Sequence, residues 1–219
     1  MHEFEAGPNR LLTLCGQHVY LLSQRAVYWP ARKTLIVADL LWEKDEAFRL
    51  QGLGLPRGVL DDDLARLQGL CRQIVPQRLL VLGDLVHSRQ GITEQVSRRI
   101  ARWRRDLKPR LVLVPANHDR HLRRLPESWG IELAPEFLEE PPFAFAHAPR
   151  ASQEFLWCGH VHPVVRLRSG LESLRLPCFR IDPACGLLPA FSRFTGGAVQ
   201  RPRPRRRLFA LAHGAVVAL

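Results

Sequence analysis

The chain of 219 residues lacks the features that mark membrane and secreted proteins. It has no run of 18 or more apolar residues, so we expect no membrane-spanning helix. Its first residues show neither a basic segment nor a following apolar one, so we expect no Sec-type export signal. The five cysteines are scattered without a Cys-x-x-Cys pair, which disfavours a disulfide framework or a cysteine-based zinc site. We therefore expect reduced thiols, a cytoplasmic location and no membrane partner.

Lysine is scarce as well. Three of the 32 basic residues are lysine and the others are arginine. Codon usage in a GC-rich genome would explain part of this bias, but a guanidinium group also matches phosphate oxygens better than an ammonium group does. The formal net charge is +11 and the sequence pI is about 10.6. Such an excess favours an anionic partner, with nucleic acid ahead of a membrane surface.

Apolar runs and periodicities predict an α/β protein with two different halves. The first half alternates buried strands with amphipathic helices, and the second half is mostly strand. The predicted strands cover residues 11–22 (two short strands around Gly16-Gln17), 34–38, 78–82, 111–114, 143–146, 155–158, 164–167, 174–179 and 208–219, and the predicted helices cover 61–75 and the residues after Thr93. No linker divides the chain, so we expect one domain over residues 1–219, made of two facing sheets with helices outside. The Pro- and Arg-rich run 201–207 is predicted to be an exposed loop.

Four short polar motifs each follow one of these apolar runs. They are Gly83-Asp84-Leu85-Val86-His87, Asn117-His118-Asp119, His147, and Gly159-His160-Val161-His162. A fifth position, Asp39, follows the run 34–38. Side chains that end strands can converge at one edge of a folded sheet, and Asp, Asn and His suit Mg²⁺, Mn²⁺, Fe²⁺ or Zn²⁺. The pattern therefore predicts a metal centre.

Hydrolysis of a phosphate ester gives these residues distinct roles. Two divalent ions bridged by one carboxylate can activate water and neutralise the phosphoryl oxygens. Asp84 is the predicted bridge, because Gly83 allows a sharp turn next to it. The two predicted ligand sets are Asn117, His147 and His160 for one ion, and Asp39 and His162 for the other. His118 could protonate the leaving oxygen. If residues 160–162 are extended, the imidazoles of His160 and His162 lie on one face of a strand.

These motifs resemble the calcineurin-like metallophosphoesterase superfamily. Over residues 10–219 the chain also resembles the bacterial ligase-associated DNA damage response endonuclease (PdeM-like) group within it. The supporting stretches are Leu82-Gly83-Asp84-Leu85-Val86-His87-Ser88-Arg89, Asn117-His118-Asp119-Arg120, Gly159-His160-Val161-His162-Pro163, Leu176-Pro177-Cys178-Phe179, and the segment 189–197.

The resemblance implies a four-layer α/β/β/α sandwich and a two-ion site that most often takes Mn²⁺. It implies that His87 helps His118 to seat the phosphate and that the substrate is DNA, single-stranded or at broken ends. A role in DNA repair beside a DNA ligase and a helicase follows from the same resemblance. The predicted contacts with the nucleic-acid backbone are Arg89, Arg120, Arg201, Arg203 and Arg205, and Trp42 could stack a base.

One departure from the family pattern concerns the first metal. The family has Asp-x-His where this chain has Asp39-Leu40-Leu41, and Leu41 cannot bind a cation. We therefore expect the Asp39/His162 position to be weak or empty, unless Glu43 substitutes. This leaves two alternatives to a DNA nuclease. One is a phosphoesterase for nucleotides or other small molecules, and the other is a catalytically weakened relative that binds nucleic acid or protein.

Overall fold

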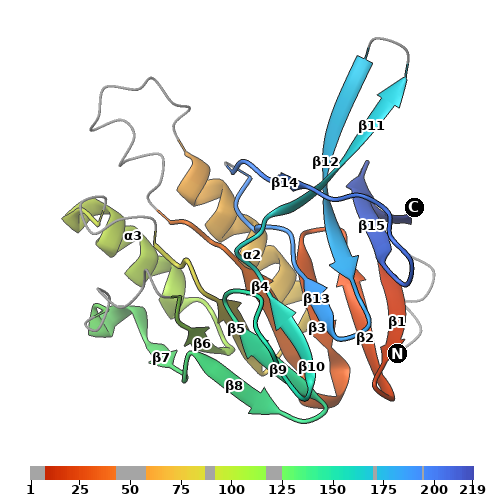
Figure 1. Ribbon diagram of the computed structural model, residues 1–219. Coiled ribbons are helices and arrows are strands. Elements are labelled where there is room, and N and C mark those ends of the chain that lie inside the picture. The colour runs from red at the N-terminus through yellow and green to blue at the C-terminus, as the bar shows by residue number, and fades with distance from the viewer. Residues whose placement is uncertain (1–7, 43–57, 87–91, 117–124, 170–171, 194) are drawn as a thin grey trace.

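A computed structural model describes residues 8–42, 58–86, 92–116, 125–169, 172–193 and 195–219. The described residues form two β-sheets and two long helices (Figure 1). The strands of the first sheet lie in sequence order: β1 (Arg10–Leu14), β2 (Gln17–Leu22), β3 (Ala26–Trp29), β4 (Thr34–Ala38), β5 (Arg78–Leu82), β6 (Arg110–Val114) and β7 (Ile131–Leu133). Pairing is antiparallel from β1 to β4 and parallel from β4 to β7.

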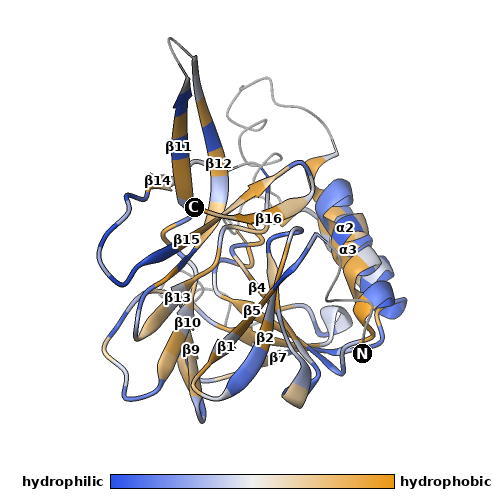
Figure 2. Cartoon of the chain, turned by 90° about the vertical axis from the view of Figure 1, so that its right-hand side faces the viewer, coloured by the Kyte–Doolittle hydropathy of each residue, from blue (hydrophilic) through white to orange (hydrophobic). Residues whose placement is uncertain are grey.

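The second sheet is built from the second half of the chain. Its order is β14-β11-β12-β13-β10-β9-β8, and β15 pairs with β12 and β16. The strand bounds are β8 (Phe137–Glu140), β9 (Phe143–Ala146), β10 (Phe155–Cys158), β11 (Pro163–Ser169), β12 (Glu172–Ile181), β13 (Cys185–Leu187), β14 (Ala198–Val199), β15 (Arg207–Ala212) and β16 (Ala215–Ala218). The hairpin of β11 and β12 projects from the body of the molecule in both views (Figures 1 and 2).

Two helices cover one face of the first sheet. They are α2 (Val59–Ile74) and α3 (Glu94–Arg105), which lie side by side on one flank of the molecule (Figure 2). The side chain of Thr93 caps α3 by accepting a hydrogen bond from the Val96 N–H at 3.2 Å. Two short 3₁₀ turns, η2 (Pro30–Arg32) and η5 (Glu127–Trp129), are the other helical elements of the described residues. Within the described ranges, no helix has both the length and the apolar character needed to cross a membrane.

The core has two layers, one on each face of the first sheet. Leucines and tryptophans of α2 and α3 pack on the outer face. The inner face packs on the second sheet, where Trp29 meets Phe143 edge to face with ring centroids 4.8 Å apart. The two facing sheets of the predicted α/β sandwich are therefore present. The second helical layer of a four-layer sandwich has no counterpart among the described residues and stays a prediction.

Three details differ from the sequence-based expectations. The segment 208–219 is a hairpin, β15 and β16, because His213 and Gly214 adopt left-handed φ angles and reverse the chain. Residues 160–162 are not extended, since the strand stops at Cys158 and the next begins at Pro163. The sequence prediction also missed five strands, most of them short: β3, β7, β8, β13 and β14. The run 201–207 is exposed up to Arg205, as expected for a loop.

The end of α2 generates a stability prediction. Val75 is the C-cap residue, with a left-handed φ of 52° and a side chain that is 68% exposed. A β-branched residue is strained in this conformation, whereas glycine is not. Val75→Gly should therefore raise the free energy of unfolding by about 1 kcal/mol, seen as a higher urea midpoint at unchanged m-value. Val75→Ala is the control that keeps a Cβ atom, and equal midpoints for the two variants would contradict the assignment of strain.

Candidate metal centre

Parallel pairing brings the ends of several strands to one place. Ala38 of β4 pairs with Leu82 of β5, so Asp39 and Asp84 follow at the same edge. In the second sheet Ala146 of β9 pairs with Cys158 of β10, which sets His147 beside Gly159. The Gly159 N–H donates to the His147 carbonyl at 2.9 Å and closes this corner. Five of the six predicted ligands lie in the described residues, and they converge here.

The backbone at four of these ligands is left-handed. The φ angles are 55° at Asp39, 43° at Asp84, 65° at His160 and 47° at His162. Non-glycine residues seldom adopt this conformation, which costs about 1–2 kcal/mol each. The turn at each position ends the strand abruptly. For His160 and His162 this replaces the expected extended backbone, so the two imidazoles reach the centre from a tight bend.

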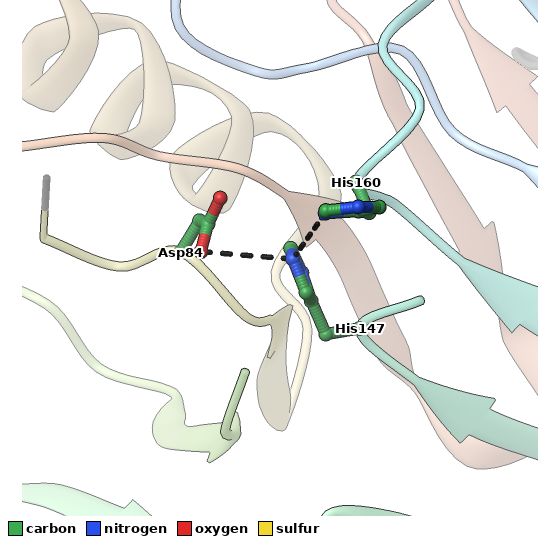
Figure 3. A group of neighbouring side chains, drawn as sticks. All are labelled: Asp84, His147 and His160. Atoms are coloured by element: carbon green, nitrogen blue, oxygen red, sulfur yellow. Dashed lines mark hydrogen bonds and ion pairs between the residues drawn. The ribbon is translucent and has the colours of Figure 1, made fainter. Parts of the chain in front are cut away.

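Asp84 is shared by two groups of donor atoms. Asp84, His147 and His160 form one group, and Asp39, Asp84 and His162 form the other, with the donor atoms in each group within 4.8 Å of one another. Figure 3 shows the first group, in which His147 lies between Asp84 and His160. The His147 Nε2 atom is 3.6 Å from Asp84 Oδ1 and 3.0 Å from His160 Nδ1. One carboxylate thus adjoins both sets of ligands, which suits a bridge between two cations.

His147 is held in the tautomer that a metal ligand needs. Its Nδ1 atom lies 3.1 Å from the backbone carbonyl of Leu82. Because a carbonyl can only accept, Nδ1 carries the proton and donates it, and Nε2 keeps a lone pair. That lone pair faces Asp84 and His160. The Leu82 carbonyl therefore fixes both the ring orientation and the ligating atom.

The second group contains one fully buried carboxylate, Asp39, and one buried nitrogen without a hydrogen-bond partner in the described part of the chain. Asp39 is 0% exposed, and its carboxylate accepts hydrogen bonds from the His160 N–H at 3.0 and 3.2 Å. The buried Nε2 atom of His162 lies 3.4 Å from Asp39 Oδ1 and has no hydrogen-bond partner among the described residues. A buried carboxylate beside an unpartnered imidazole nitrogen is an arrangement that a cation would complete. The donor set therefore fits a divalent metal.

Two glycines allow the ligands to approach so closely. A Cβ atom on Gly159 would lie 2.5 Å from Asp39 Oδ2 and 2.6 Å from Ala38 Cβ. A Cβ atom on Gly83 would overlap the imidazole of His147. Each glycine directly precedes a predicted ligand, Asp84 or His160. A glycine is required at these two positions because a side chain there would overlap the neighbouring ligand, and at Gly83 because the chain also turns.

A segment of the second half supports Asp39 from the other side. The Phe191 N–H donates to the Ala38 carbonyl at 2.8 Å, and the Ser192 N–H donates to the Asp39 carbonyl at 3.3 Å. Arg25 in turn donates to the carbonyls of Ala190 and Ser192 at 3.2 and 2.7 Å. Sequence reasoning missed Arg25, because a single arginine in a turn carries no distinguishing signal.

Leu41 lies close to the centre, where the family pattern has histidine. It is buried, its φ is 49°, and its N–H donates to the Asp84 carbonyl at 2.9 Å. Among the described residues it belongs to none of the four apolar clusters, unlike its neighbours Leu40 and Trp42. The Leu41 backbone is thus tied to Asp84, while its buried apolar side chain offers no donor atom to a cation.

Several predicted residues are not brought to the centre. Asn117, His118, His87, Arg89, Arg120 and Glu43 lie outside the described residues. Arg201, Arg203 and Arg205 are exposed in the loop between β14 and β15. The prediction that Trp42 stacks a base is wrong: the side chain is 1% exposed and packs edge to face on Trp103 and Trp129, with centroids 5.6 and 5.9 Å away.

Two open cavities flank the metal centre. One, of about 310 Å³, is lined by His162 and by Arg25, Arg175 and Arg193. The other, of about 410 Å³, is lined by His147 and His160 and carries Glu136 and Arg150. The ligands of the centre thus form part of the wall of each cavity, which gives an extended molecule room on both sides of the donor groups.

No family model matches the chain, and no curated protein matches it. Two solved structures are only weakly similar to the chain. The Aquifex aeolicus protein of unknown function AQ665 has 17% sequence identity and a TM-score of 0.41, and the match covers 59% of this chain and 78% of that chain. The E. coli phosphoesterase Yfce has 14% sequence identity and a TM-score of 0.39, and the match covers 84% of this chain and 96% of that chain. Likenesses this weak carry no argument.

A third solved structure is much more similar. The crystal structure of the Pseudomonas putida nuclease MPE matches with a TM-score of 0.83 and 35% sequence identity. The match covers 96% of this chain and 100% of the nuclease chain. The chain therefore belongs to the family of the Pseudomonas putida nuclease MPE, a family of metallophosphoesterase-like nucleases.

Proposed function

We propose that this protein is a divalent-metal-dependent phosphodiesterase that cleaves DNA. The observation that carries the proposal is the position of Asp84, whose carboxylate belongs to both donor groups. Two cations that share one carboxylate are the usual arrangement for hydrolysis of phosphate esters. Mn²⁺ is the proposed ion, with Mg²⁺, Fe²⁺ and Zn²⁺ as the alternatives that the same donors accept.

The protein residues have separate tasks in this proposal. His147 and His160 hold one ion with Asp84, and Asp39 and His162 hold the other. Bound there, the two ions supply a nucleophile near neutral pH and offset the charge of the phosphoryl oxygens. Asn117 completes the first set, His118 donates the proton to the leaving oxygen, and His87 seats the phosphate. These three roles rest on the sequence motifs.

DNA is favoured over a small phosphoester for two reasons. The similar Pseudomonas putida protein is named a nuclease. The chain carries a net charge of +11, and excess positive charge favours polyanions. We extend the proposal to single-stranded DNA or broken ends, to repair beside a DNA ligase and a helicase, and to the ligase-associated endonuclease group, all on the sequence resemblance. Arg89, Arg120, Arg201, Arg203 and Arg205 are the proposed backbone contacts.

A specific observation favours a second candidate. Leu41 is buried beside Asp84 and offers no donor atom, so the Asp39/His162 position has fewer ligands than the family pattern provides. A protein with one occupied position could bind nucleic acid without cutting it. Metal stoichiometry and turnover, measured on the same preparation, separate this candidate from the nuclease.

The first prediction concerns the shared carboxylate. Asp84→Asn removes the negative charge and one of the two carboxylate oxygens that both positions share, so Mn²⁺ binding measured by calorimetry should weaken at both, and DNA cleavage should fall by at least about 100-fold. Asp106→Asn, at an exposed residue after α3, is the charge-matched control and should leave both unchanged. Cleavage that survives in Asp84→Asn would rule out the two-ion assignment. A higher kcat/KM for a chromogenic phosphodiester than for single-stranded DNA would favour the small-substrate alternative.

The second prediction concerns the missing histidine. Leu41→His adds an imidazole next to Asp39 and Asp84 and should increase Mn²⁺ affinity at the Asp39/His162 position by about tenfold or more. Leu41→Phe adds a ring of similar size without a donor atom and serves as the control. If the natural chain binds one ion without cutting DNA while Leu41→His cuts it, the weakened-relative candidate is correct. Equal stoichiometry and equal turnover in the two chains would mean that the histidine is unimportant here.

The third prediction concerns the space beside Asp39. Gly159→Ala would place a methyl group 2.5 Å from Asp39 Oδ2, so the carboxylate or the 159–162 bend must shift. A shift of about 1 Å in a ligand is expected to lower turnover by about 100-fold. Gly69→Ala, in α2 with open space around it, is the control and should leave turnover unchanged. Full activity in Gly159→Ala would show that Asp39 is not held where catalysis needs it.

A further inference from the structure

Arginines line the cavity beside His162. Among the described residues, its charged side chains are those of Arg25, Arg175 and Arg193, with no acidic residue in the lining. The neighbouring cavity, of about 470 Å³, shares Arg25 and Arg193 and adds Arg66. We call the two adjoining cavities together the arginine-lined region.

Among the described residues, the arginines of this region outnumber the carboxylates next to them. The buried Asp63 has its Oδ1 atom 3.2 Å from the Arg66 guanidinium. The charges of Arg25 and Arg193 also act on Asp63, so three guanidinium groups share this carboxylate, and Asp62 acts on Arg66 as well. Burial lowers the pKa of Arg66 to about 10, which leaves it protonated at neutral pH. Four arginines near two carboxylates leave an excess positive charge that an anion would balance.

Two of the guanidinium groups, those of Arg25 and Arg175, are held by backbone carbonyls. Arg25 is tied to the carbonyls of Ala190 and Ser192, and Arg175 donates to the Gly197 carbonyl at 2.5 Å. A Cβ atom on Gly197 would lie 2.5 Å from the His162 carbonyl oxygen, so this wall is packed directly against the ligand bend. Ordered arginines lose less entropy on binding an anion than free ones do.

The cavity on the other side of the centre has a different lining. Among the described residues, its charged side chains are Glu136 and Arg150, one of each sign. In the part of the chain that the structure describes, the His162 side is therefore the one where arginines gather.

We propose that the arginine-lined cavity next to His162 binds a phosphate group of the nucleic-acid strand adjacent to the phosphate that is cleaved. The inference rests on the proposed function, since it concerns the same substrate at the same centre. Guanidinium groups match phosphate oxygens in geometry and charge, and a strand places a second phosphate within reach of the first. Arg193 and Arg175 are the positioning residues. Arg25 is not substituted in the test, because it also donates hydrogen bonds to the 190–192 segment.

Trinucleotides test the inference directly. Each has two linkages, and replacing one with a neutral methylphosphonate leaves a single cleavable phosphate without a charged neighbour. The methylphosphonate can stand at the first or at the second linkage, which gives two substrates. In the native chain with Mn²⁺, at least one of these two substrates should be cut about tenfold more slowly than the unmodified trinucleotide. Arg193→Gln and Arg175→Gln should already cut the unmodified trinucleotide slowly. In these variants the methylphosphonate should lower the cleavage rate by less than about a further twofold.

The control variant is Arg102→Gln, which removes the same charge at an exposed position of α3, a helix that contributes no residue to the lining of either arginine-lined cavity. It should retain the native methylphosphonate effect, and urea midpoints of all variants should match the native value. A methylphosphonate effect that persists undiminished in both cavity variants would overturn the inference. Binding of inorganic phosphate that depends on Arg193, with no methylphosphonate effect in the native chain, would assign the cavity to a free anion and would likewise overturn it.

A binding measurement separates this inference from the proposed function. The anisotropy of a labelled single-stranded oligonucleotide, recorded with a chelator present, reports binding without cleavage. Arg193→Gln should weaken binding about tenfold and should reduce the slope of log K against log salt concentration by about 0.7. Arg102→Gln should have smaller effects on both the affinity and this slope. If the native chain cuts no substrate but shows this difference, the proposed catalysis fails and the phosphate site stands. Equal binding by the two variants overturns the site alone.

Discussion

The metal centre depends on parallel strand register in two different sheets. Hydrogen bonds between β4 and β5 place Ala38 opposite Leu82, and those between β9 and β10 place Ala146 opposite Cys158. A slip of one residue in either pairing would move a ligand by about 3.3 Å and turn its side chain to the other face. The apolar layer between the sheets then sets the two edges against each other. Register and sheet packing together decide whether Asp84 meets His147.

The centre is locally unfavourable for the apoprotein. Four ligand positions have left-handed backbone, Asp39 is fully buried, and a buried nitrogen of His162 has no hydrogen-bond partner among the described residues. Such features persist when the surrounding structure holds them in place. Here the backbone of residues 190–192 and the carbonyl of Leu82 provide that support. Because a bound cation would relieve the electrostatic part of the cost, stability and metal affinity are coupled at this site.

Sequence patterns could predict those parts of the fold that depend on local order. The apolar runs that became β4, β5, β6, β9 and β10 are each followed within three residues by a candidate ligand, so the strands and the candidate ligands could be identified together. The bend at 160–162 could not, because alternating His-Val-His looks extended unless the left-handed φ angles are known. Trp42 was misassigned because burial against Trp103 and Trp129 arises from packing between distant segments. The arginine cavity joins residues more than 160 positions apart, and no local pattern encodes that contact.

The excess positive charge of the chain is unevenly distributed over the described residues. Many arginines are matched by a carboxylate, as in the pairs Arg78–Glu140 and Arg110–Glu132, and these contribute little net field. The excess therefore resides where matching fails in the described residues, which includes the cavity beside His162 and the exposed 201–205 loop. Charges on an exposed loop are screened within about 8 Å at physiological salt, and the exposed Arg175 and Arg193 are screened in the same way, whereas the partly buried Arg25 is screened less. The loop is suited to attracting a polyanion to the surface. The cavity, which adjoins the ligands themselves, is suited to fixing where along the strand the metal centre acts.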